Sequence, residues 1–355
     1  MKRREFIALG AMAAAGMGLT PAFAARPDEI RAILLHLGFN MWCDWFPAGT
    51  DLTKHPKAVP DKVLRNRDDL WRKATDHAAA KGMNMIVIDL GEGVVYPSHP
   101  ELAIEGSWSV EKLRAELARL RGLGLEPVPK LNFATSHNGW LKEYRRMVSS
   151  SVYHKVCEDL IRDVVEIFDR PRFFHLGCDE ETAGFQEWSG ETPYICVRKG
   201  EVWWYDFLHL VRTVESHGVR AWAWSDYGWH HPEFMTRCPK SVLLSNWYYD
   251  EYLGGFELSS YAAKEHRERL KNFYDLEKAG FDQVPAGTNW VSDFRRSKNA
   301  GADDVIGKLV RLCRRDIPAP RLKGFMMASW ESCDTPANLE KNIKAIDLFA
   351  EALGS

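Results

Sequence analysis

The sequence lacks the charge pattern of a nucleic-acid-binding protein. Its 47 basic residues nearly balance its 49 acidic ones, the formal net charge is −2, and no long block of like charge occurs. Phosphate-binding loops of the G-x-G-x-x-G and G-x-x-x-x-G-K-[ST] types are missing, as is the G-x-S-x-G nucleophile motif. We therefore predict no nucleic-acid partner, no nucleotide site of those types and no serine-hydrolase elbow.

Closely spaced cysteine pairs are missing as well. The seven cysteines form no C-x-x-C motif and are scattered along the chain at Cys43, Cys157, Cys178, Cys196, Cys238, Cys313 and Cys333. An odd, dispersed set disfavours a disulfide framework, so we expect free and mostly buried thiols and no structural zinc. His230-His231 has no partner at ligand spacing, and we interpret it as a surface loop rather than a metal site. We predict neither a metal ion nor a cofactor.

The N-terminus has the pattern of an export signal. Arg3-Arg4-Glu5-Phe6-Ile7 is followed by an apolar run to about Leu19 and then by Ala22-Phe23-Ala24. A basic start, an apolar stretch too short to span a membrane and an A-x-A ending predict a signal peptide over residues 1–24, and the paired arginines resemble the twin-arginine type. An uncleaved N-terminal anchor is the alternative. We expect the bacterial twin-arginine machinery to deliver the protein to the periplasm or the medium.

No segment after the signal holds about 20 uninterrupted apolar residues, so we expect no stable membrane anchor in the mature protein. Instead, short apolar runs alternate with longer amphipathic stretches through residues 25–355. The strand-like runs cover residues 33–42, 85–89, 125–133, 172–176, 220–224, 241–247, 281–290 and 322–330. Eight strand-then-helix units predict a single-domain (β/α)₈ TIM barrel, an α/β fold. A doubly wound open sheet is the alternative.

Polar and aromatic side chains follow almost every one of these runs. Because the active sites of such barrels lie at the carboxyl ends of the strands, we expect these residues to share one rim. They are Asn40, Trp42, Asp89, His137, Asp179, Glu180, Trp224, Asp226, Trp247, Tyr248, Asp250, Trp290, Trp330 and Glu331. The chain has 14 tryptophans, and flat indole faces stack well on sugar rings. Those at strand ends fit a carbohydrate pocket, whereas Trp71, Trp203 and Trp204 lie in helical stretches and are predicted to pack in the core.

Asp179-Glu180 after the fourth run gives the sharpest signal. Two adjacent acids repel each other, which favours a neutral acid beside an ionised partner. That division of labour suits glycosidic bond cleavage, in which one group protonates the leaving oxygen and another stabilises positive charge on the sugar. A helix-capping acidic cluster is the alternative for these two residues taken alone.

The chain resembles glycoside hydrolase family 20, the β-N-acetylhexosaminidases, at this point. The fourth strand of that family ends in His-x-Gly-Gly-Asp-Glu, and His175-Leu176-Gly177-Cys178-Asp179-Glu180 matches it except at Cys178. Weaker similarities follow in order along the chain, at 129–137 (PKLNFATSH), Trp224 with Asp226, Tyr248-Tyr249-Asp250 and Trp330-Glu331.

The resemblance implies a substrate-assisted retaining mechanism, in which the 2-acetamido oxygen of the sugar attacks the anomeric carbon. It implies that Asp179 orients the acetamido group and that Glu180 is the general acid and then the general base. Tyr248 would bond the acetamido oxygen, while Asp250 and Glu331 would bind hydroxyl groups. The tryptophans Trp224, Trp247 and Trp330 would wall the pocket, and His175 would support the Asp-Glu turn.

Two departures from the family separate this chain from an ordinary hexosaminidase. The family usually has an arginine after its first strand, whereas residues 39–44 read FNMWCD. We also expect no small α/β domain before the barrel. Two other interpretations therefore stay open. One is a glycosidase for sugars without an acetamido group that uses Glu180 with Glu331 or Asp226, and the other is a periplasmic sugar-binding barrel without turnover.

Overall fold

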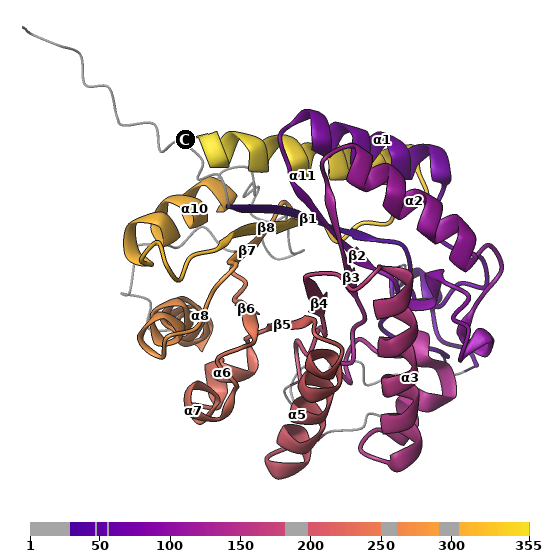
Figure 1. The fold of residues 1–355 in the computed structure, drawn as a ribbon, viewed down its shortest axis with the longest axis horizontal. Coiled ribbons are helices and arrows are strands. Elements are labelled where there is room, and N and C mark those ends of the chain that lie inside the picture. The colour runs from indigo at the N-terminus through magenta and orange to yellow at the C-terminus, as the bar shows by residue number, and fades with distance from the viewer. Residues whose placement is uncertain are drawn as a thin grey trace, which may run out of the picture.

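A computed structural model describes residues 29–46, 48–54, 57–181, 198–249, 261–290 and 305–354. Its centre is one sheet of eight parallel strands in the order β6-β5-β4-β3-β2-β1-β8-β7. The strands are β1 (Ile30–His36), β2 (Met85–Asp89), β3 (Glu126–Lys130), β4 (Phe173–His175), β5 (Arg220–Trp224), β6 (Leu243–Ser245), β7 (Ala286–Thr288) and β8 (Gly324–Ala328). Helices surround this ring of strands (Figure 1).

The sheet closes on itself between β6 and β7. Single parallel bridges join Leu244 to Gln283 and Trp247 to Ala286 across this gap. The N–H of Ala286 also donates to the carbonyl of Asn246 at 2.9 Å. Closure of eight parallel strands makes a (β/α)₈ barrel, so the predicted fold is confirmed and the open sheet is wrong.

The helical layer alternates with the strands along the chain. Its α-helices are α1 (Asp68–Ala80), α2 (Val110–Gly122), α3 (Ser151–Ile167), α5 (Glu201–Ser216), α6 (Tyr227–His230), α7 (Phe234–Arg237), α8 (Tyr261–Lys278), α10 (Val305–Asp316) and α11 (Pro336–Gly354). Short 3₁₀ turns are η1 (Leu52–Lys54), η2 (Gly91–Gly93), η3 (Pro100–Leu102) and η4 (Gly139–Met147). Ser109 caps α2 by accepting the N–H of Lys112 at 3.2 Å.

Strand geometry sorts the apolar residues into two separate cores. Successive side chains of a strand point to opposite faces, so Ala32 and Leu34 of β1 lie inside the barrel, whereas Ile33 and Leu35 face the helices. The barrel interior is filled mainly by small and aliphatic side chains at its amino end and by aromatic rings toward its carboxyl end. Gly324 lets β8 approach β1 closely, because a Cβ atom there would lie 2.0 Å from the carbonyl oxygen of Ile30.

The tryptophans that the sequence assigns to packing lie in the outer core. Trp71, Trp203 and Trp204 are each 1% exposed, and the ring of Trp203 stacks on Tyr227 with 3.5 Å between centroids. The cysteines of the described residues are buried and free. Among the helices that the structure describes, none is both long and apolar enough to cross a membrane.

Candidate active site

The turn after β4 carries Asp179 and Glu180 in a strained backbone. Gly177, Cys178 and Glu180 have φ values of 72°, 64° and 55°, in the left-handed region that side chains disfavour. Glycine is required at the first position, because a Cβ atom on Gly177 would lie 2.0 Å from Oδ1 of Asn132. Non-glycine residues in this region cost about 1–3 kcal/mol each and persist where surrounding contacts fix them, which is typical of functional sites.

His137 joins the two carboxylates from the loop after β3. Its Nε2 lies 3.0 Å from Oε2 of Glu180 and 3.4 Å from Oδ2 of Asp179. Burial alone would lower the pKa of His137, but the negative charges of Asp179 and Glu180 raise it to about 9. A protonated imidazole therefore bridges the pair at neutral pH. Asn132 adds a hydrogen bond from Nδ2 to Oδ1 of Asp179 at 2.8 Å.

Asp226, which follows β5, lies behind this turn. Its Oδ2 accepts the backbone N–H of Glu180 at 2.7 Å, and the residue is buried, with 2% exposed. Burial and the nearby charge of Asp179 raise the pKa of Asp226 to about 8, although the bond from Glu180 opposes this shift. Asp226 is therefore neutral at pH 7 and fixes the backbone that presents Glu180. Its Oδ1 has no hydrogen-bond partner within the described part of the chain.

Aromatic rings form one wall beside the acidic turn. Trp224 lies 5.0 Å from the ring of His175 and 6.1 Å from that of Trp330, with both distances between centroids. Trp247 stacks on Tyr249 at 4.9 Å, and Tyr249 lies 6.5 Å from Trp330. Together these residues make a continuous, largely buried aromatic cluster at the carboxyl end of the barrel.

Tyr248 does not line this wall, which corrects the position expected from the sequence. It is fully buried in the outer core, and its ring lies 6.0 Å from His266 of α8. Tyr249 packs against the inner aromatic cluster instead. Trp229 was not singled out from the sequence, yet its ring contacts Trp247 at 4.6 Å in that cluster.

His175 and Asp89 are supporting residues inside the barrel. Nδ1 of His175 accepts the N–H of Gly177 at 3.0 Å, and burial lowers the pKa of His175 so that it stays neutral. Asp89 forms a buried ion pair with Lys130, and His36 lies 3.4 Å from the same carboxylate. Burial alone would raise the pKa of Asp89, but the charges and hydrogen bonds of Lys130 and His36 together outweigh it, and the pKa is lowered.

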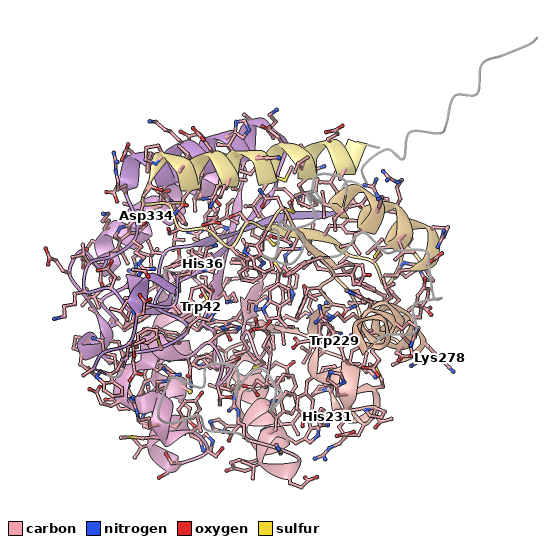
Figure 2. All side chains as sticks on the ribbon, turned by 180° about the vertical axis from the view of Figure 1, so that it is seen from behind. His36, Trp42, Trp229, His231, Lys278 and Asp334 are labelled. Atoms are coloured by element: carbon pink, nitrogen blue, oxygen red, sulfur yellow. The ribbon has the colours of Figure 1, made fainter. Side chains whose placement is uncertain are left out.

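The residues after β1 are divided between structure and pocket. The side chain of Asn40 exchanges two hydrogen bonds with the backbone of Asp61, at 2.7 and 2.9 Å, so it fixes a loop. The ring of Trp42 contacts His137 edge-on at 6.3 Å, which places it beside the acidic turn. Figure 2 labels His36 and Trp42, which lie nearer the centre of the molecule than Lys278 of α8.

The remaining predicted residues come from the last three strands. Oε1 of Glu331 is buried against two ammonium groups, those of Lys57 and Lys341, each at 2.9 Å. Trp290 is 38% exposed and lies outside the inner aromatic cluster. Asp250 lies outside the described residues.

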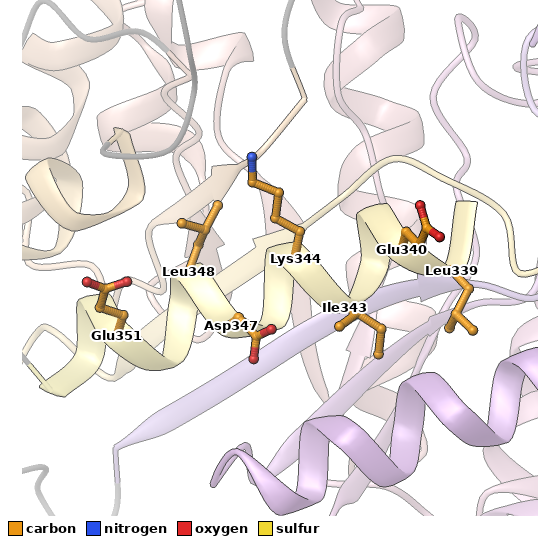
Figure 3. A pocket seen from close by; sticks show the side chains of 7 residues that line it. All are labelled: Leu339, Glu340, Ile343, Lys344, Asp347, Leu348 and Glu351. Atoms are coloured by element: carbon orange, nitrogen blue, oxygen red, sulfur yellow. The ribbon is translucent and has the colours of Figure 1, made fainter. Parts of the chain in front are cut away.

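A surface groove along α11 is separate from this site. Figure 3 shows the side chains that line it, from Leu339 to Glu351, all on that helix. Asp347 in the groove pairs with His77 and Lys81 at 2.9 and 2.7 Å, which ties α11 to the neighbouring helical segment. The groove therefore belongs to the packing of the helical layer, and the acidic turn with its aromatic wall is the candidate site.

Comparison with known proteins identifies structural relatives. No protein-family model and no curated protein sequence matches the chain. A β-N-acetylhexosaminidase from Bacteroides fragilis matches with a TM-score of 0.58 and 12% identity, over 90% of this chain and 66% of its own. A GH20 exo-β-N-acetylglucosaminidase from Vibrio harveyi, in complex with N-acetylglucosamine, matches with a TM-score of 0.56 and 13% identity. The match covers 93% of this chain and 55% of that one. Dispersin B matches with a TM-score of 0.54 and 14% identity, over 82% of this chain and 95% of its own.

The chain thus spans less than two thirds of the first two of these structures and nearly all of the third. At these identities the match concerns architecture. The resemblance to family 20 seen in the sequence is confirmed at the level of the barrel fold.

The pH dependence of stability tests the buried carboxyl group. The folded-state pKa of Asp226, about 8, exceeds the ordinary value of 3.8, so the folded protein binds more protons between these values and its stability falls as pH rises. His137 acts in the same direction, because its stabilisation is complete below about pH 6.5 and is lost as pH rises through about 9. Asp226→Asn should flatten the decline in the free energy of unfolding between about pH 5 and about pH 8, measured by urea denaturation.

Asp169→Asn is the matched control, because the Asp169 side chain is 78% exposed. We expect it to keep the wild-type slope. Equal slopes for Asp226→Asn and the wild-type protein would show that the Asp226 carboxyl is ionised at neutral pH.

Proposed function

We propose that this protein is a glycoside hydrolase that removes terminal N-acetylhexosamine residues by substrate-assisted retention. The observation that carries the proposal is the pair Asp179 and Glu180, joined by protonated His137 at the carboxyl end of β4. Glu180 is the more accessible of the two, with 27% of its side chain exposed against 9% for Asp179. The match in fold to solved hexosaminidases, one of them a Streptomyces plicatus enzyme in complex with its product GlcNAc, supports the assignment.

In the first step the acetamido oxygen of the sugar bonds to the anomeric carbon while the glycosidic bond breaks. Glu180 takes up the proton that His137 carries 3.0 Å from its Oε2 and passes it to the departing oxygen, and an oxazolinium ion is left. Asp179, held by Asn132 at 2.8 Å, orients the acetamido N–H and stabilises the positive charge of that ion. In the second step Glu180 takes a proton from water as the water oxygen bonds to the anomeric carbon. The bond from that carbon to the acetamido oxygen breaks, which opens the oxazolinium ring.

The aromatic wall then orients the sugar. Trp224, Trp247 and Trp330 pack against the ring and the acetamido methyl group, and Tyr249 takes the hydrogen-bonding role that the resemblance alone would give to Tyr248. Asp226 is a poor candidate for an enzymatic nucleophile, because it is buried and neutral near pH 7. The neutrality of Asp226 favours the acetamido group of the substrate as the nucleophile.

Activity on matched substrates tests the proposal. We expect the protein to hydrolyse aryl N-acetyl-β-glucosaminide or N-acetyl-β-galactosaminide and not the corresponding plain glucoside or galactoside. Glu180→Gln should lower kcat by about 10²- to 10⁴-fold, because the leaving oxygen loses its proton donor. Equal rates on plain glycosides would exclude the acetamido group as nucleophile, and tight sugar binding without turnover would indicate a binding protein.

Tyr248 and Tyr249 offer a matched pair of variants. Tyr249→Phe should lower kcat by about 10²-fold, since it removes a hydroxyl beside the inner aromatic wall. Tyr248→Phe removes the same group from the outer core, so kcat should stay within about 3-fold of wild type, a change of less than 1 kcal/mol in the barrier. Steady-state kinetics on the preferred acetamido substrate gives the comparison. A larger loss of kcat in Tyr248→Phe would reverse the assignment.

We also propose that residues 1–24 direct export by the twin-arginine route, because Arg3 and Arg4 precede a short apolar run and Ala22-Phe23-Ala24. These residues lie outside the described part of the chain. Changing Arg3 and Arg4 together to lysine should leave the precursor in the cytoplasm of a bacterial host, as cell fractionation and immunoblotting would show. Export at the wild-type level by that variant would contradict the route.

A further inference from the structure

Glu181 is the third acid of the run after β4, and it bonds Thr135 and Arg198 rather than His137. Its side chain is fully buried, and Oε1 accepts the backbone N–H of Thr135 at 2.9 Å. Both of its oxygens also accept from Arg198, from Nη2 at 2.5 Å and from Nε at 3.3 Å. Glu181 is therefore bonded both to the β3 loop and to Arg198, 17 positions later in the chain.

Arg198 extends this connection to a helix. It is 4% exposed and donates from Nη1 to Oδ2 of Asp206 in α5 at 2.8 Å, and from Nη2 to the carbonyl of Phe133 at 2.7 Å. Asp206 is also buried and accepts the hydroxyl of Ser149 at 2.6 Å, and His154 of α3 lies 2.8 Å from its other oxygen. The network of Glu181, Arg198 and Asp206 thus joins the end of β4 to the β3 loop, α5 and α3.

A buried network of this kind is weak evidence for stability, because removing three charges from water costs about as much as their pairing returns. Its effect here is geometric. Glu181 directly follows Glu180, whose backbone is left-handed with φ 55°. Thr135 precedes His137 by two residues in the loop whose imidazole bridges the acidic pair. The network therefore holds both sides of the contact between His137 and Glu180.

Two further side chains of the β3 loop bond Asp179 rather than Glu180. Asn132 and Ser136 of the β3 loop donate to its carboxylate and to its carbonyl at 2.8 and 3.0 Å. The backbone of Glu180 is held on its far side by Asp226. The continuation of the chain after Glu180 is held by Arg198, through Glu181.

We propose that Glu181, Arg198 and Asp206 are positioning residues that keep the general acid Glu180 in register with His137. The role rests on the proposed function for its catalytic consequence. Its structural consequence, the proximity of His137 to the acidic pair, can be measured without any substrate.

Arg198→Lys and Glu181→Gln test the network while conserving size and much of the bonding. Lysine keeps the charge but cannot donate to Glu181, Asp206 and Phe133 with a planar fork. Glutamine keeps an acceptor for Thr135 but loses the charge. We expect each variant to lower kcat by about 10- to 100-fold with KM within about 3-fold, because a small displacement of the acid is costly in the transition state.

Titration of His137 by NMR gives the second readout. If the β3 loop and the turn separate, the pKa of His137 should fall from about 9 toward its ordinary value of about 6.5 in both variants. Arg237→Lys is the matched control, because Arg237 forms an exposed two-bonded pair with Glu201 at the start of α5, at 2.6 and 2.9 Å. It should leave kcat and the His137 titration unchanged.

A lower melting temperature with unchanged kcat and an unchanged His137 titration would overturn the positioning role. If the wild-type protein hydrolyses no acetamido substrate, the proposed function fails, and the His137 titration still decides between a positioned and an unaffected imidazole. Should Arg198→Lys fail to fold, Glu181→Gln carries the test with the same two readouts.

Discussion

Repulsion among buried carboxyl groups is the constraint around which this site is organised. Unit charges 4 Å apart repel by about 4 kcal/mol at the effective dielectric of a protein surface. Four carboxyl groups lie at the carboxyl ends of β4 and β5, those of Asp179, Glu180, Glu181 and Asp226. Their repulsion is reduced in three different ways. Asp226 is neutral, Glu181 is paired with Arg198, and Asp179 and Glu180 share the proton-bearing ring of His137. Asp179 and Glu180 are thereby left together at the end of β4, in a left-handed backbone that their neighbours fix.

The division of the barrel into an inner and an outer core decides what each aromatic residue can do. Side chains alternate between the two along a strand, so a shift of one position moves a ring from the barrel interior to the helix interface. Trp222 and Trp224 both point inward, whereas Ala221 and Ala223 between them face the helices. The same alternation continues past the end of β6, where Trp247 and Tyr249 lie inside and Tyr248 outside.

The fold was largely predictable because fully buried parallel strands appear as short apolar runs. The adjacent acids were predictable because they are neighbours in the sequence directly after a buried strand, so no long-range contact had to be inferred. Tyr248 was assigned to the wrong face. Tyr249 lies two residues after Trp247, and this spacing indicates that Tyr249 shares the inner face with Trp247. Arg198 could not be predicted, since it reaches Glu181 across 17 positions with no motif between them. The first strand also ends sooner than its apolar run, at His36, because the chain turns against η2 and the N–H groups of Leu37 and Gly38 both bond to Asp89.

The cations beside Trp330 and Glu331 come from a loop and a helix. Asn40 lies in the segment where family 20 usually has an arginine. Its side-chain amide forms two hydrogen bonds with the backbone of Asp61. The loop that it fixes carries Lys57, whose ammonium bonds both Glu331 and the carbonyl of Trp330 at 2.9 and 3.2 Å. Lys341 reaches the same carboxylate oxygen from α11. Positive charge is thus supplied to this wall by a loop and a helix rather than by the first strand. Both ammonium groups bond Oε1 of Glu331, so Glu331 is the residue that places the two lysines.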